Sequence, residues 1–177
     1  MLDLPITRWL KPALLASALF LLACSPKYDW REVRGAGAPF MVMLPAKPAS
    51  HARPINLGGT QVTMTMTAAE VDGVSFAVGT AEMPDASQAQ KALAAMKTAL
   101  VKNIGGTIKQ EKSSPAGTAP TLIEIEASGA AGSGQSRLLL ARFVAKGQRI
   151  YQVVVVGPEQ AVSREAADTF FTSFKPG

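Results

Sequence analysis

The amino-acid sequence predicts a single α+β domain, a mainly antiparallel β-sheet covered by helices on both faces. Three observations lead to this fold class. Residues 61–68 alternate strictly between apolar residues and threonine or other polar residues, which is typical of a half-buried strand. Residues 86–103 and 163–174 repeat apolar side chains at helical spacing. Residues 137–146 and 149–156 are apolar on both sides, which indicates central strands with cover on each face.

The first 24 residues predict an export signal that ends in a lipid attachment site. Arg8 and Lys11 precede an apolar run that is shorter than the ~20 apolar residues of a membrane-spanning helix. The run ends in Leu21-Leu22-Ala23-Cys24, which resembles the processing site of bacterial lipoproteins. The resemblance implies cleavage before Cys24, a diacylglycerol thioether on its sulfur and, in most Gram-negative members, a third acyl chain. Two or three chains make a lasting membrane anchor.

Cys24 is the only cysteine of the chain, so no intramolecular disulfide can form. The alternative to acylation is an ordinary cleaved signal peptide with Cys24 as a leftover or buried thiol. Ser25 stands where an Asp would resemble an inner-membrane retention signal, so in a Gram-negative host the resemblance implies the outer membrane, facing the periplasm. We expect residues 1–23 to be the signal peptide, 24–28 a short tether and 29–177 one domain.

The first half of the domain is expected to be all strand and turn. Residues 29–34 and 40–44 predict two short strands separated by a Gly- and Pro-containing turn, and residues 45–59 predict a loop rich in turn formers. The alternating strand 61–68 then leads through a turn at Asp72-Gly73 into residues 74–83, the other arm of a hairpin.

The second half is expected to contain both helices. Asp85 or Ser87 can cap a helix over residues 86–103, which Gly105-Gly106 ends; its apolar stripe is Ala89, Leu93, Met96, Leu100 and Ile104. Four strands follow at 107–112, 121–128, 137–146 and 149–156. Gly157-Pro158 ends the last of them, and Ser163 can cap a helix that runs to Phe174 with the stripe Ala167, Phe170, Phe171 and Phe174.

Two apolar stripes allow a functional as well as a structural interpretation. Val62, Met64 and Met66 share one face of their strand, and thioethers bind soft metals, but adaptable core packing explains them as well. The phenylalanine stripe of the last helix is expected in the core, with a surface for a partner or a lipid as the alternative.

Residues that would carry chemistry are sparse. His51, the only histidine, lies in the predicted loop with no carboxylate nearby in sequence, so we expect a solvated side chain and no general base. No nucleophile elbow occurs. Residues 129–134, GAAGSG, have no following lysine and lead into a strand, which favours a hairpin loop over a phosphate site. We therefore predict no enzyme activity, no catalytic or metal-ligating residue and no cofactor.

Charged residues suggest two weaker candidates. Glu124 and Glu126 lie two apart on one strand face, which could present paired carboxylates to a cation or could simply be the solvated face. Arg137, Arg142, Lys146 and Arg149 bring positive charge to one hairpin, which could bind an acidic partner or a headgroup, or form a solvated rim. The chain's net charge of +5 is scattered, without the aromatic and basic interleaving that binds nucleic acid.

Several segments together resemble the PsbP-like superfamily: PFMVMLPAKP near the start, the helix ending in Gly-Gly, the hairpin RFVAKGQRIYQVVVV and the final ADTFFTSFK. The resemblance covers most of residues 29–175 and implies an antiparallel sheet between helices and a non-enzymatic binding or assembly role. We therefore expect a membrane-anchored accessory lipoprotein of the cell envelope with a membrane-proximal protein partner. The alternative is a periplasmic carrier or sensor of a small apolar ligand or metal.

Overall fold

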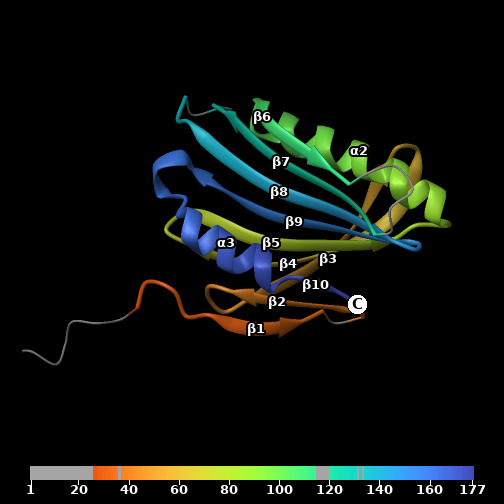
Figure 1. Cartoon of the computed structure of the whole chain (residues 1–177), viewed down its shortest axis with the longest axis horizontal. Coiled ribbons are helices and arrows are strands. Elements are labelled where there is room, and N and C mark those ends of the chain that lie inside the picture. The colour runs from red at the N-terminus through yellow and green to blue at the C-terminus, as the bar shows by residue number, and fades with distance from the viewer. Residues whose placement is uncertain (1–25, 36, 115–119, 131, 133) are drawn as a thin grey trace, which may run out of the picture.

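The computed structural model describes residues 26–35, 37–114, 120–130, 132 and 134–177, so Cys24 and the predicted signal segment lie outside it. The described chain forms one α+β domain with two sheets (Figure 1). The strands are β1 (Arg31–Arg34), β2 (Phe40–Leu44), β3 (Ala49–Leu57), β4 (Thr60–Val71), β5 (Val74–Glu82), β6 (Gly106–Ser113), β7 (Thr121–Gly129), β8 (Arg137–Lys146), β9 (Arg149–Pro158) and β10 (Lys175–Pro176). The helices are α2 (Ala86–Asn103), α3 (Arg164–Ser173) and the short 3₁₀ turn η2 (Glu159–Ala161).

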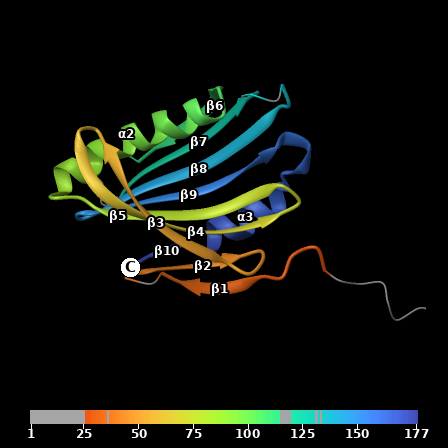
Figure 2. The ribbon, with the colours of Figure 1, turned by 180° about the vertical axis from the view of Figure 1, so that it is seen from behind.

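The large sheet has seven strands in the order β3-β4-β5-β9-β8-β7-β6, and every neighbouring pair is antiparallel. Helix α2 packs on one face. Helix α3 and the small sheet β1-β2-β10 cover part of the other face, as the two views from opposite sides show (Figures 1 and 2). The prediction of a single, mainly antiparallel α+β domain is confirmed, and the small sheet is a further layer that it did not contain.

The central strands are buried on both sides, as their apolar sequence predicts. Val153 and Val155 of β9 belong to the core under α3, whereas Ile150 and Val154 of the same strand belong to the core under α2. All four are at most 5% exposed. Because neighbouring residues of a strand point to opposite faces, only a sheet covered on both sides can bury such a run.

The helices begin and end where the sequence predicts. Of the two candidate caps of α2, Asp85 is the one used, since its Oδ1 accepts a hydrogen bond of 2.8 Å from the backbone N–H of Gln88. Gly105, with φ of +55°, ends the helix. The Oγ of Ser163 caps α3 by accepting from the N–H of Ala166 at 3.2 Å. The predicted phenylalanine stripe lies in the core, with Phe170 fully buried.

The prediction of a loop over residues 45–59 is wrong, because β3 occupies most of it. Strand β3 is the edge of the large sheet and pairs only with β4; almost all of its side chains are exposed, so no apolar alternation marks it in the sequence. The two-residue turn Gly58-Gly59 makes Leu57 and Thr60 a hydrogen-bonded pair, so Pro54 falls at a position whose N–H would point away from β4. Pro54 therefore removes no hydrogen bond between β3 and β4. Because proline has no N–H, it also leaves no donor at the centre of the free edge for another strand to pair with.

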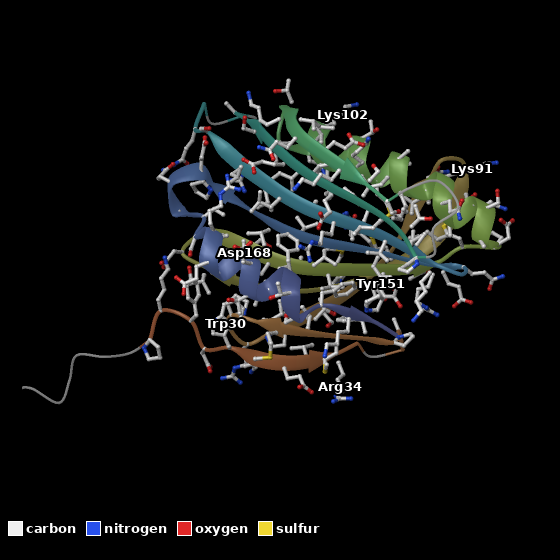
Figure 3. All side chains as sticks on the ribbon, in the orientation of Figure 1. Trp30, Arg34, Lys91, Lys102, Tyr151 and Asp168 are labelled. Carbon is white, nitrogen blue, oxygen red and sulfur yellow. The ribbon has the colours of Figure 1, made fainter. Side chains whose placement is uncertain are left out.

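The N-terminal segment is held at one end of the large sheet, which we call the tethered end. Lys27 Nζ lies 3.1 Å from Asp72 Oδ2 in the β4–β5 turn. The Tyr28 ring packs at a tilt against Trp30, and Trp30 meets the ring of Phe76 on the sheet edge-on. Figures 2 and 3 show the segment leaving the domain beside that turn and Trp30 close to the small sheet. None of the helices in the described part of the chain is long and apolar enough to cross a membrane.

Candidate functional site

Glu124 and Glu126 share one face of β7, as predicted, and face the side of the sheet on which α3 lies. There they line an open groove between α3 and the outer strands β6 and β7, with a volume of about 250 Å³. We call it the α3 groove; its charged residues are Glu111, Lys112, Glu124, Glu126, Arg142, Arg164 and Asp168, and Phe171 forms part of its wall.

Each of the two glutamates forms an ion pair with an arginine. Glu126 accepts two hydrogen bonds from Arg164, at 2.8 and 2.7 Å, so the pair is bidentate. Glu124 Oε1 lies 2.5 Å from Nε of Arg142, its cross-strand neighbour on β8. With both carboxylates neutralised in this way, the pair offers no free dianionic site for a cation. Among the residues that the structure describes, no group of three or more His, Cys, Asp or Glu side chains is arranged to hold a metal ion.

The ion pairs also position α3. Arg164 joins the N-terminal turn of α3 to β7, while Arg142 Nη1 donates to the backbone carbonyl of Phe171 near the C-terminal end of the helix, at 2.9 Å. The guanidinium carbon of Arg142 also lies 4.8 Å from the centre of the Phe171 ring, within the range of a cation–π contact. A cation close to the final carbonyls complements the helix dipole. The helix is therefore fixed at both ends by side chains from the sheet.

The electrostatics of the groove follow from these contacts. The hydrogen bonds from Arg164 lower the pKa of Glu126, and the same bonds raise the pKa of Arg164. Both groups are therefore charged over the whole neutral range. Lys112 and Asp168 are exposed and make no ion pair within the described residues. These two side chains are thus the charges of the groove that remain available to another molecule.

The other predicted basic residues do not form a patch. Arg149 pairs with Glu82 at 2.6 Å, and Lys146 lies 3.5 Å from the carbonyl oxygen of Pro176. Arg142 faces α3, as described above. Arg137 is the first residue of β8 and lies beside the C-terminal end of α2, at the other end of the strand from Lys146. The hairpin therefore distributes its positive charge over two faces and two ends of the sheet.

The remaining candidates from the sequence lie in a strand, in the core or in a hairpin connection. His51 is exposed on β3, a strand and not the predicted loop. Met64 is 4% exposed and packs with Val62 and Met66 in the core under α2, where the Met66 sulfur accepts a hydrogen bond from the Gln152 amide. Residues 129–134 join β7 to β8 as the predicted hairpin connection, although Ala131 and Ser133 lie outside the described residues.

Sequence reasoning missed Arg164 and Asp168, the contribution of α3 to the groove. Arg164 stands 38 residues from its partner Glu126, and nothing in the local pattern of either segment signals their meeting. The available signal was the position of Arg164 directly after the Ser163 cap. A charged residue in the first turn of a helix that packs on a sheet is placed where its side chain can reach the sheet.

Comparisons with known proteins leave the family open. No family model matches the sequence, and no curated protein matches it. Among solved structures, the chain is similar to LpqN, described as involved in cell envelope biogenesis of Mycobacterium tuberculosis, with 12% identity and a TM-score of 0.43 over 83% of this chain and 90% of that chain. The PsbP-like resemblance and the lipid anchor therefore stay predictions.

Proposed function

We propose that the chain is a lipid-anchored, non-catalytic accessory protein of the bacterial cell envelope that binds a membrane-proximal protein through the α3 groove. The observation that carries the proposal is the shortness of the segment between the candidate anchor and the domain. Only Ser25 and Pro26 separate Cys24 from Lys27, which is paired with Asp72.

This segment limits where a partner can be. Four residues of extended chain from Cys24 to Tyr28 span at most about 14 Å. The Lys27 pair and the packing of Tyr28 and Trp30 further fix the direction in which the chain leaves the domain. Acyl chains on Cys24 would therefore hold the tethered end close to the lipid, and the ten residues of β8 would carry the opposite end only about 33 Å farther.

The α3 groove is suited to a polar and reversible interface. Interfaces between non-obligate partners are about as apolar as the rest of a protein surface, so they need no large apolar patch. In the described residues, Ile108 is the one large apolar residue that is more than about a third exposed, at 38%. The groove combines charges of both signs with the ring of Phe171, and Lys112 and Asp168 form no ion pair with any residue that the structure describes. A partner with complementary charges would bind there with an affinity that falls as salt concentration rises.

Cross-linking with mass spectrometry on the native lipoprotein in its own membrane tests this proposal. We expect a specific protein neighbour whose cross-links cluster around α3 and β6. The double variant Lys112→Glu with Asp168→Lys keeps the net charge but reverses the charge pattern of the groove, and it should lose that neighbour.

The matched control is Lys91→Glu with Glu70→Lys, which also preserves net charge and alters exposed residues away from the groove; Lys91 projects from α2, far from Asp168 (Figure 3). The control should retain the neighbour. The proposal fails if no specific protein is recovered, or if both double variants lose it equally.

A further inference from the structure

A second hollow lies on the opposite face of the large sheet, between the C-terminal half of α2 and strands β8 and β9. We call it the α2 cleft. Its volume is about 370 Å³, and its lining is apolar except at two positions. The apolar lining consists of Leu100, Ile104, Leu139, Val154 and Val156, and the polar residues are Asn103 and Arg137.

The cleft exists because α2 crosses the sheet at an angle. The helix packs on β8 and β9, but Gln88 near its start bonds to Thr60 of β4 and Ile104 at its end lies against Gly129 of β7, so the last residues of β9 are not covered by it. Val156 is consequently only half-buried, although Val154, two residues earlier on the same face, is 5% exposed. The sheet therefore presents an apolar surface beside the helix without a side chain to cover it.

Arg137 is the unusual residue of this lining. It is half-buried, and within the described residues it makes no ion pair or side-chain hydrogen bond, whereas the other half-buried arginines of these residues, Arg142 and Arg149, both pair with carboxylates. Glu159, the residue after its ladder partner Pro158, bonds to Ser136 instead. Arg137 thus lines a mainly apolar cleft without a counter-ion among the described residues, and this favours the binding of an anion.

The cleft lies at the tethered end of the sheet. Arg137 pairs with Pro158 in the ladder, and Pro158 lies against Gly73 of the β4–β5 turn, whose Asp72 holds Lys27. Arg137 and the N-terminal segment are thus at the same end, on opposite faces. If Cys24 is acylated, the cleft lies at the end of the sheet that is near the lipid surface.

We infer that the α2 cleft binds one acyl chain of an anionic lipid, with the chain against Leu139, Val154 and Val156 and the anionic group at Arg137. The volume lies near the lower limit of the roughly 300–1,000 Å³ typical of small-molecule sites, which suits a single chain. The chemistry of the ligand follows from the cleft itself. Only its source, the membrane, rests on the proposed anchor.

Photo-cross-linking of the full-length lipoprotein tests the inference. The protein is reconstituted into vesicles of phosphatidylglycerol that carries a diazirine in one acyl chain, and labelled peptides are mapped by mass spectrometry. We expect adducts in the peptides that contain residues 100–104 and 154–156. Val156→Trp, which fills the cleft from a half-exposed position, should reduce these adducts at least about fivefold. Ile108→Trp, on exposed β6, should not.

The anion at Arg137 is tested in the same system. Arg137→Gln should reduce labelling about fivefold in phosphatidylglycerol but not in phosphatidylcholine. The matched control, Lys102→Gln, removes a solvent-facing charge from the last turn of α2 (Figure 3) and should leave labelling unchanged. If Arg137→Gln lowers the thermal midpoint but leaves labelling of the folded protein intact, Arg137 has only a structural role and the anion site is refuted.

A second arm separates the cleft from the anchor. A diazirine-bearing fatty acid, offered in solution, reaches the cleft without a membrane. Labelling of residues 100–104 and 154–156 by the free fatty acid but not by vesicles would support the ligand class and refute the membrane as its source. An absence of adducts in both arms, or adducts spread evenly over the surface, would overturn the inference.

Discussion

Arg142 connects β7, β8 and α3, so replacing it with methionine tests whether these contacts hold the helix on the sheet. The guanidinium lies 2.5 Å from Glu124, donates to the Phe171 carbonyl at 2.9 Å and covers the Phe171 ring at 4.8 Å. The side chain is 33% exposed, so solvent screens these interactions only in part. Methionine has a similar length and can still pack on Phe171, which limits the loss to the polar contacts.

The magnitude follows from the three contacts. A hydrogen bond from a charged donor contributes about 1.5–3 kcal/mol, a partly exposed ion pair about 0.2–1 kcal/mol and a cation–π contact of this kind about 0.5–1 kcal/mol. These contributions are not additive, because one side chain makes all of them and Glu124 keeps Lys112 as its neighbour on β6. We therefore expect Arg142→Met to lower the free energy of unfolding by about 2–3 kcal/mol.

Arg164→Met is the matched comparison. Arg164 is 59% exposed, and its ion pair among the described residues is with Glu126, so its loss should cost less than about 1 kcal/mol. Both variants and the parent are measured by urea unfolding of the domain without its signal segment, at neutral pH and with the slopes compared. The reasoning fails if Arg142→Met costs no more than Arg164→Met, or if its cost is below about 0.5 kcal/mol.

Three further outcomes follow from the structure. Phe170→Ala removes a fully buried ring between α3 and the large sheet and should lower the free energy of unfolding by about 3–5 kcal/mol; a loss under about 1 kcal/mol would show that α3 is not part of the core. Ser163→Ala removes the α3 cap and should cost about 1 kcal/mol, whereas Ser87→Ala, beside the Asp85 cap of α2, should be near zero; equal losses would contradict the assignment of the caps. Because Arg164 lowers the pKa of Glu126 in the folded state, the contribution of this pair is present above the unfolded value of about 4.3 and is lost as pH falls through the folded value. The stability difference between the parent and Glu126→Gln should therefore be constant near neutral pH and disappear in strong acid, and a difference that persists there would refute the pairing.

Strands with a buried face were predictable because their pattern is local. The alternation of β4 and the two-sided apolar runs of β8 and β9 appear in the sequence, and so do the stripe and the end signals of α2. Strand β3 carries no such pattern, since an exposed edge strand gains its structure from hydrogen bonds to β4 and not from burial. Strand β10 has two residues and exists only because β2 is beside it. Such elements depend on the assembled fold.

The candidate sites divide in the same way. That Glu124 and Glu126 share a face follows from the period of a strand, and the structure confirms it. That both are neutralised depends on the register of β7 against β8 and on where α3 lies, neither of which a local pattern contains. Arg137 and Arg142 appear equivalent in the sequence of β8. They differ because they lie an odd number of positions apart on the strand, so their side chains point to opposite faces of the sheet. Arg137 lines the α2 cleft, and Arg142 lines the α3 groove.

The central claim is that acyl chains on Cys24 hold this domain against a membrane, and the mass of the N-terminal peptide of the protein purified from its native membrane tests it most directly. The account predicts a mature chain that begins at Cys24 and carries the mass of a diacylglyceryl group, with or without a third acyl chain. A chain that begins elsewhere, or one in which Cys24 is unmodified, would contradict the claim.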